Sequence, residues 1–230
     1  MKLGSKISHD SLPTSFSLTA LRRLFNTLCA AAGLLLLSPL FVFIGLAILL
    51  DDGRPIVYSQ PRIGKDFRKF RLLKFRSMIL HADRLAPLTA LRDVRITRVG
   101  RFLRRYKLDE LPQLLNVLKG EMQLVGSRPE LERYVEKFRR QYALLLCDPP
   151  GITDPATLAY RNEEDWLEPG RVEEQYISKI LPRKLELSLE YMQHRTFGSD
   201  LSMLIRTVLH IPWVSKAGPI PTQATSEPKP

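Results

Sequence analysis

The sequence predicts an α+β fold that is mostly helical, with an N-terminal membrane helix, a short β-hairpin and amphipathic helices around a compact core. Three observations predict it: an uncharged apolar run from Leu24 to Leu50, a β-like stretch over 55–78, and apolar residues at helical spacing from residue 95 onward. The chain has 230 residues, 44% of them hydrophobic, which suffices for one globular domain with a core and additional segments.

The N-terminal part divides into a polar and an apolar segment. Residues 1–20 are polar and rich in serine, which predicts a mobile tail. Residues 21–52 hold the apolar run, which is too long for a secretory signal and has no small-residue cleavage site before Asp51. We therefore expect a membrane helix, because about 20 apolar residues span the hydrocarbon core of a bilayer.

Ser38 and Pro39 interrupt this apolar run near its middle. Proline removes a backbone donor and kinks a helix, and the Ser38 hydroxyl can satisfy part of the freed backbone. Basic residues flank both ends, with Arg22 and Arg23 before the run and Arg54 after it, and basic flanks prefer the cytoplasm. From the residues alone, a re-entrant hairpin and a kinked full span fit equally well.

The rest of the chain, residues 53–216, predicts one domain on the cytoplasmic side of the membrane. Its first part contains two β-like runs, 55–60 and 67–78, around a turn at Gly64, and a helix is the alternative for the second run. Helical patterns follow over 95–107, 108–120, 131–146 and 171–194, the last with a break at Pro182, and an apolar segment covers 201–214. Residues 217–230 are rich in Pro, Ser and Thr, which predicts a disordered tail.

A formal net charge of +11 implies an anionic partner, such as nucleic acid, acidic lipid headgroups or a phosphorylated substrate.

In the stretch 95–107, Ile96, Val99 and Leu103 form one apolar stripe among basic residues. This pattern fits a helix on an acidic membrane surface, and a solvated charged face over a core stripe is the alternative. No RNA-binding aromatic motif occurs, so we expect no nucleic-acid partner. The two cysteines predict neither a disulfide framework nor a zinc site.

Asp109 and Glu110 are the candidate reactive groups. Pro112 is tolerated only in the first turn of a helix, so the helix begins near Leu108 and both carboxylates fall in its opening turn. The free backbone donors of a helix start favour ionised carboxylates, as a metal ligand or nucleophile requires, although capping alone also explains acidic residues there. Arg128 and the basic residues before the pair indicate phosphate chemistry, in which Mg²⁺ bridges the carboxylates and a diphosphate.

Several stretches form an ordered set of motifs: Lys74-Phe-Arg-Ser-Met78, Thr97-Arg-Val-Gly-Arg-Phe-Leu-Arg104, Leu108-Asp-Glu-Leu-Pro-Gln-Leu-Leu-Asn-Val-Leu-Lys-Gly120, Leu124-Val-Gly-Ser-Arg-Pro129 and Pro150-Gly-Ile-Thr153. This set resembles the bacterial sugar transferase family, the monotopic polyprenyl-phosphate phosphoglycosyl transferases. The resemblance covers residues 20–215, and its block from Asp109 to Pro129 is highly specific.

The resemblance implies both a membrane arrangement and a reaction. The N-terminal helix would be a re-entrant hairpin broken at Ser38 and Pro39, in the bacterial inner membrane, with amphipathic interfacial helices and a catalytic domain on the cytoplasmic face. The enzyme would move a sugar-1-phosphate from a UDP-sugar to polyprenyl (undecaprenyl) phosphate and release UMP in a ping-pong mechanism. This is the first membrane step of a pathway such as exopolysaccharide or lipopolysaccharide biosynthesis.

The resemblance also implies roles for individual residues. Asp109 would be the nucleophile that takes the phosphosugar, and Glu110 would assist through Mg²⁺ or proton transfer, so both are candidate metal ligands. The residues that match substrate-binding positions of the family are Arg76, Arg128, Pro129, Arg161 and Asp200, the last two by looser alignments.

The chain departs from the family pattern after Thr153. Asp154 and Pro155 follow where the family usually has glycine, and the loop to Glu164 lacks the common Gln-Val-Asn-Gly-Arg ending, which leaves the identity of the sugar open.

Without the extra membrane domain of larger members, the chain is expected to be the small catalytic-core form. The competing hypothesis is a non-catalytic, membrane-tethered basic binding or scaffold module. The sequence leaves the oligomeric state open, and a homodimer is among the states that it allows.

Overall fold

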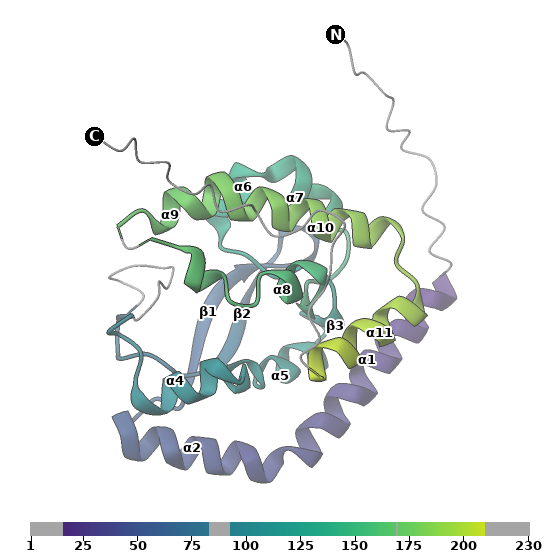
Figure 1. Cartoon of the computed structure of the whole chain (residues 1–230). Helices are drawn as coiled ribbons and strands as arrows, with labels where there is room; N and C mark the ends of the chain where they lie inside the picture. The colour runs from purple at the N-terminus through teal and green to yellow at the C-terminus, as the bar shows by residue number, and fades with distance from the viewer. Residues whose placement is uncertain (1–15, 83–92, 169, 210–230) are drawn as a thin grey trace, which may run out of the picture.

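The structure is a computed structural model that describes residues 16–82, 93–168 and 170–209 (Figure 1). The predicted tail at 217–230 and most of the predicted tail at 1–20 lie outside the described residues. The first helix begins at Phe16, inside the segment predicted as a tail. Residues 16–21 carry no proline or glycine and include Phe16, Leu18 and Leu21, so the helix extends ahead of the apolar run.

The apolar run forms two helices, α1 (Phe16–Leu36) and α2 (Ser38–Asp52), bent by 60° at Leu37. Taken singly, none of the helices in the described residues is long and apolar enough to cross a membrane, whereas this bent pair passes by length and composition when counted together. The predicted break at Ser38 and Pro39 is therefore confirmed. Figure 1 shows α2 along the bottom of the molecule and α1 rising from it along the lower right side.

The chemistry of the break follows from the proline. Pro39 has no N–H, so the carbonyl of Leu35, four residues earlier, loses its helical donor. The hydroxyl of Ser38 donates to that same carbonyl at 2.8 Å. The predicted use of Ser38 to satisfy the freed backbone is thus confirmed.

The bent pair has an outer and an inner apolar face. On the inner face, Ala30, Ile44 and Ile48 are buried against the rest of the protein. The outer face exposes a row of large apolar side chains, namely Leu24, Leu28, Leu35, Leu36, Val42, Phe43, Leu46 and Leu50. Exposed apolar surface of this extent marks an interaction with a membrane or another protein.

The predicted β-hairpin is confirmed as β1 (Val57–Ile63) and β2 (Lys69–Phe75), paired antiparallel around a turn at 64–68. The hairpin lies between an upper and a lower group of helices (Figure 1). Its pleat sends Phe70 and Leu72 into the core shared with α1, whereas Phe75 packs in a separate cluster with α2. β2 therefore packs against both halves of the N-terminal pair, against α1 through Phe70 and Leu72 and against α2 through Phe75 at its end.

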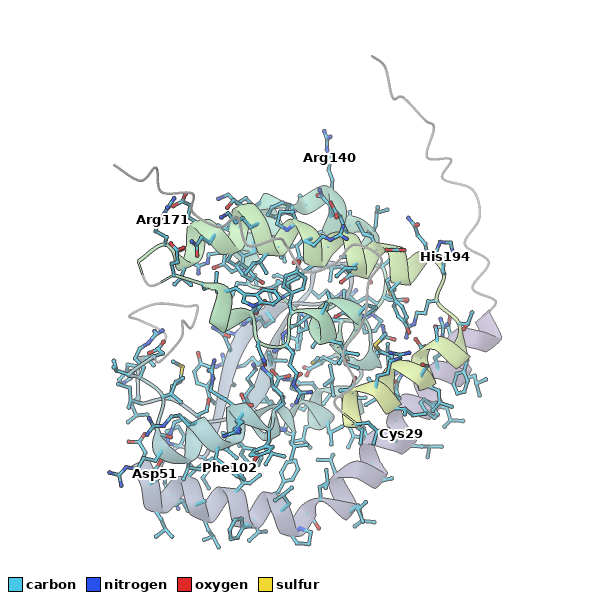
Figure 2. The ribbon with its side chains drawn as sticks, viewed as in Figure 1. Cys29, Asp51, Phe102, Arg140, Arg171 and His194 are labelled. Carbon is cyan, nitrogen blue, oxygen red and sulfur yellow. The ribbon has the colours of Figure 1, made fainter. Side chains whose placement is uncertain are left out.

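The lower group contains α4 (Arg98–Arg105), the 3₁₀ turn η2 (Leu108–Glu110) and α5 (Gln113–Leu118). The basic helix is shorter than predicted because Thr97 caps it, its side chain accepting from the Gly100 N–H. Gly100 allows a close approach, since a Cβ there would lie 2.0 Å from the Ser77 carbonyl oxygen. Leu103 is buried as the stripe predicts, and Phe102 points outward from α4 with 58% exposure (Figure 2).

Two three-residue strands form a parallel pair that the sequence did not predict. They are β3 (Gln123–Val125) and β4 (Gly151–Thr153). Gly126 and Gly151 permit the contact, because a Cβ on Gly151 would lie 2.1 Å from the Gly126 nitrogen.

The upper group and the C-terminal part consist of α6 (Glu132–Lys137), α7 (Arg139–Leu145), α8 (Pro155–Ala159), the 3₁₀ turn η3 (Glu163–Trp166), α9 (Val172–Gln175), the π-turn η4 (Tyr176–Ile180), α10 (Leu181–Gln193) and α11 (Phe197–Val208). The predicted helix over 131–146 breaks at Phe138, which leaves the helical region. The predicted break at Pro182 takes the form of the preceding π-turn, which fits the donor missing at that proline.

Candidate active site

The two candidate carboxylates lie in the short turn η2, between α4 and α5. Lys107 adopts the left-handed conformation, with φ of 57°, and turns the chain sharply before the pair. The structure differs here from the predicted continuous helix: a 3₁₀ turn ends at Glu110, and α5 begins only after Pro112. The turn sends Asp109 and Glu110 into different surroundings.

Asp109 is buried, with 5% of its surface exposed, and its Oδ1 has no hydrogen-bond partner in the described part of the chain. Burial raises the pKa of this carboxyl above its ordinary value, and the nearby Lys74 ammonium opposes that shift. The helix start was expected to hold this carboxylate with backbone donors, and the structure does not place them on Oδ1. Asp109 therefore lines a cavity and keeps one buried carboxylate oxygen unpaired in the described part of the chain.

Glu110 is instead held by two cations. Lys74 Nζ lies 3.3 Å from Oε1, and Arg128 donates from Nη1 to Oε2 at 3.1 Å and from Nη2 to Oε1. Burial alone would raise the pKa of Glu110, but Arg128 and Lys74 outweigh burial and keep this pKa well below its usual range. Glu110 is therefore ionised because of side-chain cations rather than because of a helix end.

The pKa of Lys74 also depends on burial and on the charges around it. Burial lowers the pKa of its ammonium, and the neighbouring Arg128 lowers it further, while Glu110 and Asp109 raise it. The Lys74 charge thus depends on the two carboxylates that it faces.

The dyad opens on a cavity of about 530 Å³ between the lower and upper helices. Its basic lining residues are Arg62, Lys74, Arg76, Arg104, Lys107, Arg128, Arg161 and Lys184, and its acidic ones are Asp109, Glu110, Glu130 and Glu163. Leu111, Leu114, Leu124, Ile152, Leu158 and Leu204 add an apolar wall. An excess of positive charge around a free carboxylate suits a ligand that carries phosphate groups.

Arg128 and Arg161, two of the residues predicted to bind substrate, both line this cavity. Arg161 follows α8 and lines the wall together with Tyr160 and Glu163, in the loop where the sequence departs from the family pattern. Pro129 is buried and does not line the cavity; its carbonyl accepts from Arg62 at 3.3 Å. Pro129 therefore shapes the turn that carries Arg128.

Arg76 reaches the cavity wall, but its guanidinium is engaged elsewhere. It donates to the backbone carbonyls of Asp52, Gly53 and Arg54 at 2.7–2.8 Å and pairs with the Asp52 carboxylate at 3.2 Å. These groups form the C-terminal end of α2, where unpaired carbonyls attract a cation. Arg76, which directly follows β2, therefore connects the end of β2 to the C-terminal end of α2.

Asp200 lies apart from the dyad and does not line the cavity. It accepts from Tyr191 at 2.7 Å and from Arg195 at 2.8 Å, and Arg22 of α1 lies 3.4 Å away. A buried carboxylate with three such partners fastens α11 and α10 to α1. Asp200 was predicted to bind substrate by a loose alignment with the family. The structure does not bring this residue to the candidate site.

Sequence reasoning missed Lys74, Glu130 and Tyr176 as parts of the site. Lys74 stands in the quoted motif with Arg76, two residues apart, so strand alternation could have placed both on one face. Glu130 follows Pro129 directly and was visible as an acidic residue beside Arg128. Tyr176 carried no signal, because its place depends on how α10 packs.

Comparison with known proteins decides the family. The sequence model of the family described as "Bacterial sugar transferase" matches residues 17–213. The chain belongs to the bacterial sugar transferase family. The resemblance carried by the motifs is therefore confirmed, and so is the expectation of an enzyme rather than a non-catalytic module.

Three relatives show what members of this family are named for. The chain is 35% identical over 193 residues to the "UDP-glucose:undecaprenyl-phosphate glucose-1-phosphate transferase" of Escherichia coli (strain K12), covering 82% of this chain and 39% of that protein. It is 35% identical over 203 residues to the "Undecaprenyl-phosphate galactose phosphotransferase" of Salmonella typhimurium, covering 81% and 39%. It is 32% identical over 203 residues to the "Exopolysaccharide production protein ExoY" of Rhizobium meliloti, covering 81% and 83%.

The relatives differ in length. The chain spans about two fifths of the Escherichia coli and Salmonella proteins but more than four fifths of ExoY. What these proteins share with this chain is therefore the sugar transferase region.

Proposed function

We propose that this protein transfers a sugar-1-phosphate from a UDP-sugar to polyprenyl phosphate and releases UMP. One observation carries the proposal: Asp109 lines a basic cavity and has a buried carboxylate oxygen, Oδ1, without a hydrogen-bond partner among the described residues, beside a glutamate whose two oxygens are both paired. The names of the relatives include undecaprenyl phosphate and UDP-glucose, which supports the same substrates for this protein.

Asp109 attacks the phosphorus that bears the sugar. The bond between this phosphorus and the oxygen bridging to the nucleotide phosphate breaks, UMP leaves with that electron pair, and the phosphosugar is bound to Asp109. A phosphate oxygen of the polyprenyl phosphate then attacks the same phosphorus and displaces the Asp109 carboxylate. The unpaired Oδ1 supports Asp109 as the nucleophile, since a nucleophile needs a free electron pair.

Glu110 and its two cations hold the phosphates. Arg128 and Lys74 lie next to the dyad, and their charges neutralise the negative charge that gathers on the phosphate oxygens. Glu110 keeps both cations in place and ionised. Its role is therefore to orient the phosphate-binding groups beside Asp109.

We further propose that Mg²⁺ serves as cofactor. Over residues 16–82, 93–168 and 170–209, no three His, Cys, Asp or Glu side chains meet as a metal site. Mg²⁺ is commonly held by one or two carboxylates together with substrate phosphates, and Asp109, whose Oδ1 has no hydrogen-bond partner among the described residues, suits this arrangement. Glu110 suits it less, because both of its oxygens are bonded to cations. When bound, Mg²⁺ would neutralise charge on the diphosphate.

We also propose that α1 and α2 enter one leaflet of the inner membrane as a re-entrant hairpin, with the catalytic part on the cytoplasmic face. The exposed apolar outer face and the 60° bend support this placement. Phe102 of α4 and Tyr106 directly after it are both exposed and would contact the headgroup region.

The reaction is tested by UMP release. The purified protein, in vesicles with polyprenyl phosphate and Mg²⁺, is offered a panel of UDP-sugars, and Asp109→Asn is compared with the unaltered chain. We expect UMP from at least one donor and none from the variant. Without acceptor, the peptide containing Asp109 should gain the mass of one phosphosugar. A wild-type rate of UMP release in Asp109→Asn would show that Asp109 is not the nucleophile. If the unaltered chain released no UMP from any donor, the proposed reaction would be wrong.

A further inference from the structure

The wall of the same cavity holds a second group of polar side chains that the proposed reaction does not use. It consists of Arg62 on β1, Glu130 after β3 and Tyr176 in the π-turn η4. Glu130 and Tyr176 are 7% and 2% exposed. Burying a carboxylate costs free energy unless it is paired and hydrogen-bonded, so the partners of Glu130 decide what this group does.

Each carboxylate oxygen of Glu130 has its own partner. Tyr176 donates its hydroxyl hydrogen to Oε1 at 2.6 Å, and Arg62 Nη1 donates to Oε2 at 3.1 Å. The same Arg62 nitrogen donates to the Pro129 carbonyl at 3.3 Å, and the Ile63 N–H donates to the Glu130 carbonyl at 3.1 Å. The side chain and the backbone of Glu130 are thus both fixed.

These contacts determine the position of Arg128. Before it, the Ser127 carbonyl accepts from the Gly151 N–H at 2.8 Å. After it, Glu130 is fixed to β1 and to Tyr176. Arg128 therefore lies in a turn held at both ends, and its guanidinium is hydrogen-bonded to Glu110 on the wall of the cavity.

Tyr176 reaches Glu130 because of the π-turn. An extra residue in a helical turn rotates the side chains before it relative to those that follow, and such turns are frequent at functional sites. The π-turn ends just before Pro182, which cannot continue the regular ladder. The Tyr176 ring is held by Tyr134, 5.2 Å away between centroids, and by the Lys184 ammonium, 5.3 Å from its centroid.

We infer that Tyr176 and Glu130 are positioning residues that set Arg128 for the phosphates of the donor. The Tyr176 hydroxyl fixes the Glu130 carboxylate, Glu130 fixes the turn, and the turn aims the Arg128 guanidinium. This inference rests on the proposed function, because it assigns Arg128 to the donor phosphates. The competing role is stability alone, as for any satisfied buried network.

Tyr176→Phe tests the inference, because it removes only the hydroxyl and keeps the ring between Tyr134 and Lys184. Tyr142→Phe is the matched control: Tyr142 is a buried tyrosine of the same core cluster and makes no hydrogen bond to Glu130 in the described residues. We expect Tyr176→Phe to lower kcat/KM for the UDP-sugar at least ten-fold, at a melting temperature close to that of Tyr142→Phe. A kcat/KM within two-fold of that control would overturn the inference.

A double-mutant cycle with Arg128→Lys separates positioning from stability. If Tyr176 acts through Arg128, then Tyr176→Phe should change kcat/KM less than three-fold once Arg128 is lysine. Losses that multiply in the double variant would mean that Tyr176 acts independently of Arg128, and the inference would be wrong.

Binding of inorganic diphosphate, measured by calorimetry, does not depend on turnover. We expect at least five-fold weaker binding in Tyr176→Phe and unchanged binding in Tyr142→Phe. If diphosphate binds as expected while no UDP-sugar yields UMP, the proposed reaction fails and the positioning role stands. Equal diphosphate affinity in the unaltered chain and in Tyr176→Phe, or none in either, would overturn the positioning role. Should Tyr176→Phe not fold, Glu130→Gln takes its place in the same three measurements.

Discussion

Arg128 donates two hydrogen bonds to the carboxylate of Glu110, one to each oxygen. A planar guanidinium can make this paired contact, whereas a lysine ammonium has a single nitrogen and cannot. We therefore expect Arg128→Lys to keep the charge and lose the geometry. One charge-assisted hydrogen bond contributes about 1.5–3 kcal/mol, so kcat/KM for the UDP-sugar should fall about 10- to 100-fold.

Steady-state UMP release measures this loss, and Arg140→Lys is the control. Arg140 projects from α7 away from the body of the molecule (Figure 2), so its replacement should leave kcat/KM unchanged. If Arg128→Lys retained the full rate, the paired contact with Glu110 would have no part in donor binding.

Pro39→Ala should change how the N-terminal pair sits in the membrane. The new residue restores the N–H that the Leu35 carbonyl lacks, so α1 and α2 can join into one straight helix. That joined apolar stretch is long enough to cross a bilayer. The N-terminus should then move to the outer side of the inner membrane.

Cysteine labelling in intact cells reports this change. A probe cysteine is placed by Ser5→Cys in a chain whose own Cys29 and Cys147 are replaced by serine. We expect a membrane-impermeant reagent to label it only together with Pro39→Ala, while a control probe at Arg140→Cys stays unlabelled throughout. Labelling of Ser5→Cys without the proline change would contradict the re-entrant hairpin.

The position of this break was predictable because its cause is local. Pro39 and Ser38 act on a carbonyl four or fewer residues away, so their neighbours in the sequence are also their neighbours in space. The hairpin strands β1 and β2 and the basic helix α4 were predictable for the same reason. By contrast, β3 and β4 are three residues long, too short for a periodic pattern, and their pairing joins residues from 123 to 153.

Asn116→Ala should destabilise the fold. Asn116 is fully buried and serves the open edge of β2: its Oδ1 accepts from the Leu73 N–H at 3.1 Å, and its Nδ2 donates to the Arg71 carbonyl at 2.8 Å. The side chain thus takes the place of a further strand. Alanine would remove the partner of two part-buried backbone groups, at a cost of about 2–4 kcal/mol.

Thermal unfolding in detergent tests this cost, and we expect the melting temperature to fall by about 5–10 °C. Asn162→Ala is the matched control, because the Asn162 side chain is exposed and caps no helix. A melting temperature equal to that of the control would show that the edge of β2 does not need Asn116.

The candidate site was only partly predictable for a related reason. Asp109 and Glu110 could be singled out by type and spacing, but their different environments arise from Lys74 and Arg128, which come from a strand and from a distant turn. No sequence pattern separates a free carboxylate from a paired one. The sequence also failed to show that Asp200 has a structural role. This carboxylate was predicted to bind substrate, but it holds helices together through Tyr191 and Arg195.

The stability of the fold should depend on pH through Glu130. Burial by itself would raise the pKa of Glu130, but Arg62, Lys184 and the Tyr176 hydrogen bond together keep it below its ordinary value of 4.5. A carboxyl whose pKa is lowered by folding stabilises the folded state above the unfolded pKa, and this contribution is lost as pH falls through the folded pKa. We therefore expect the difference in melting temperature between the unaltered chain and Glu130→Gln to be constant from pH 7 to about pH 5 and to shrink below about pH 4.5. A difference that stayed the same down to pH 3 would mean that Glu130 has equal pKa values in the folded and unfolded states, and that Arg62 and Tyr176 do not stabilise its charge.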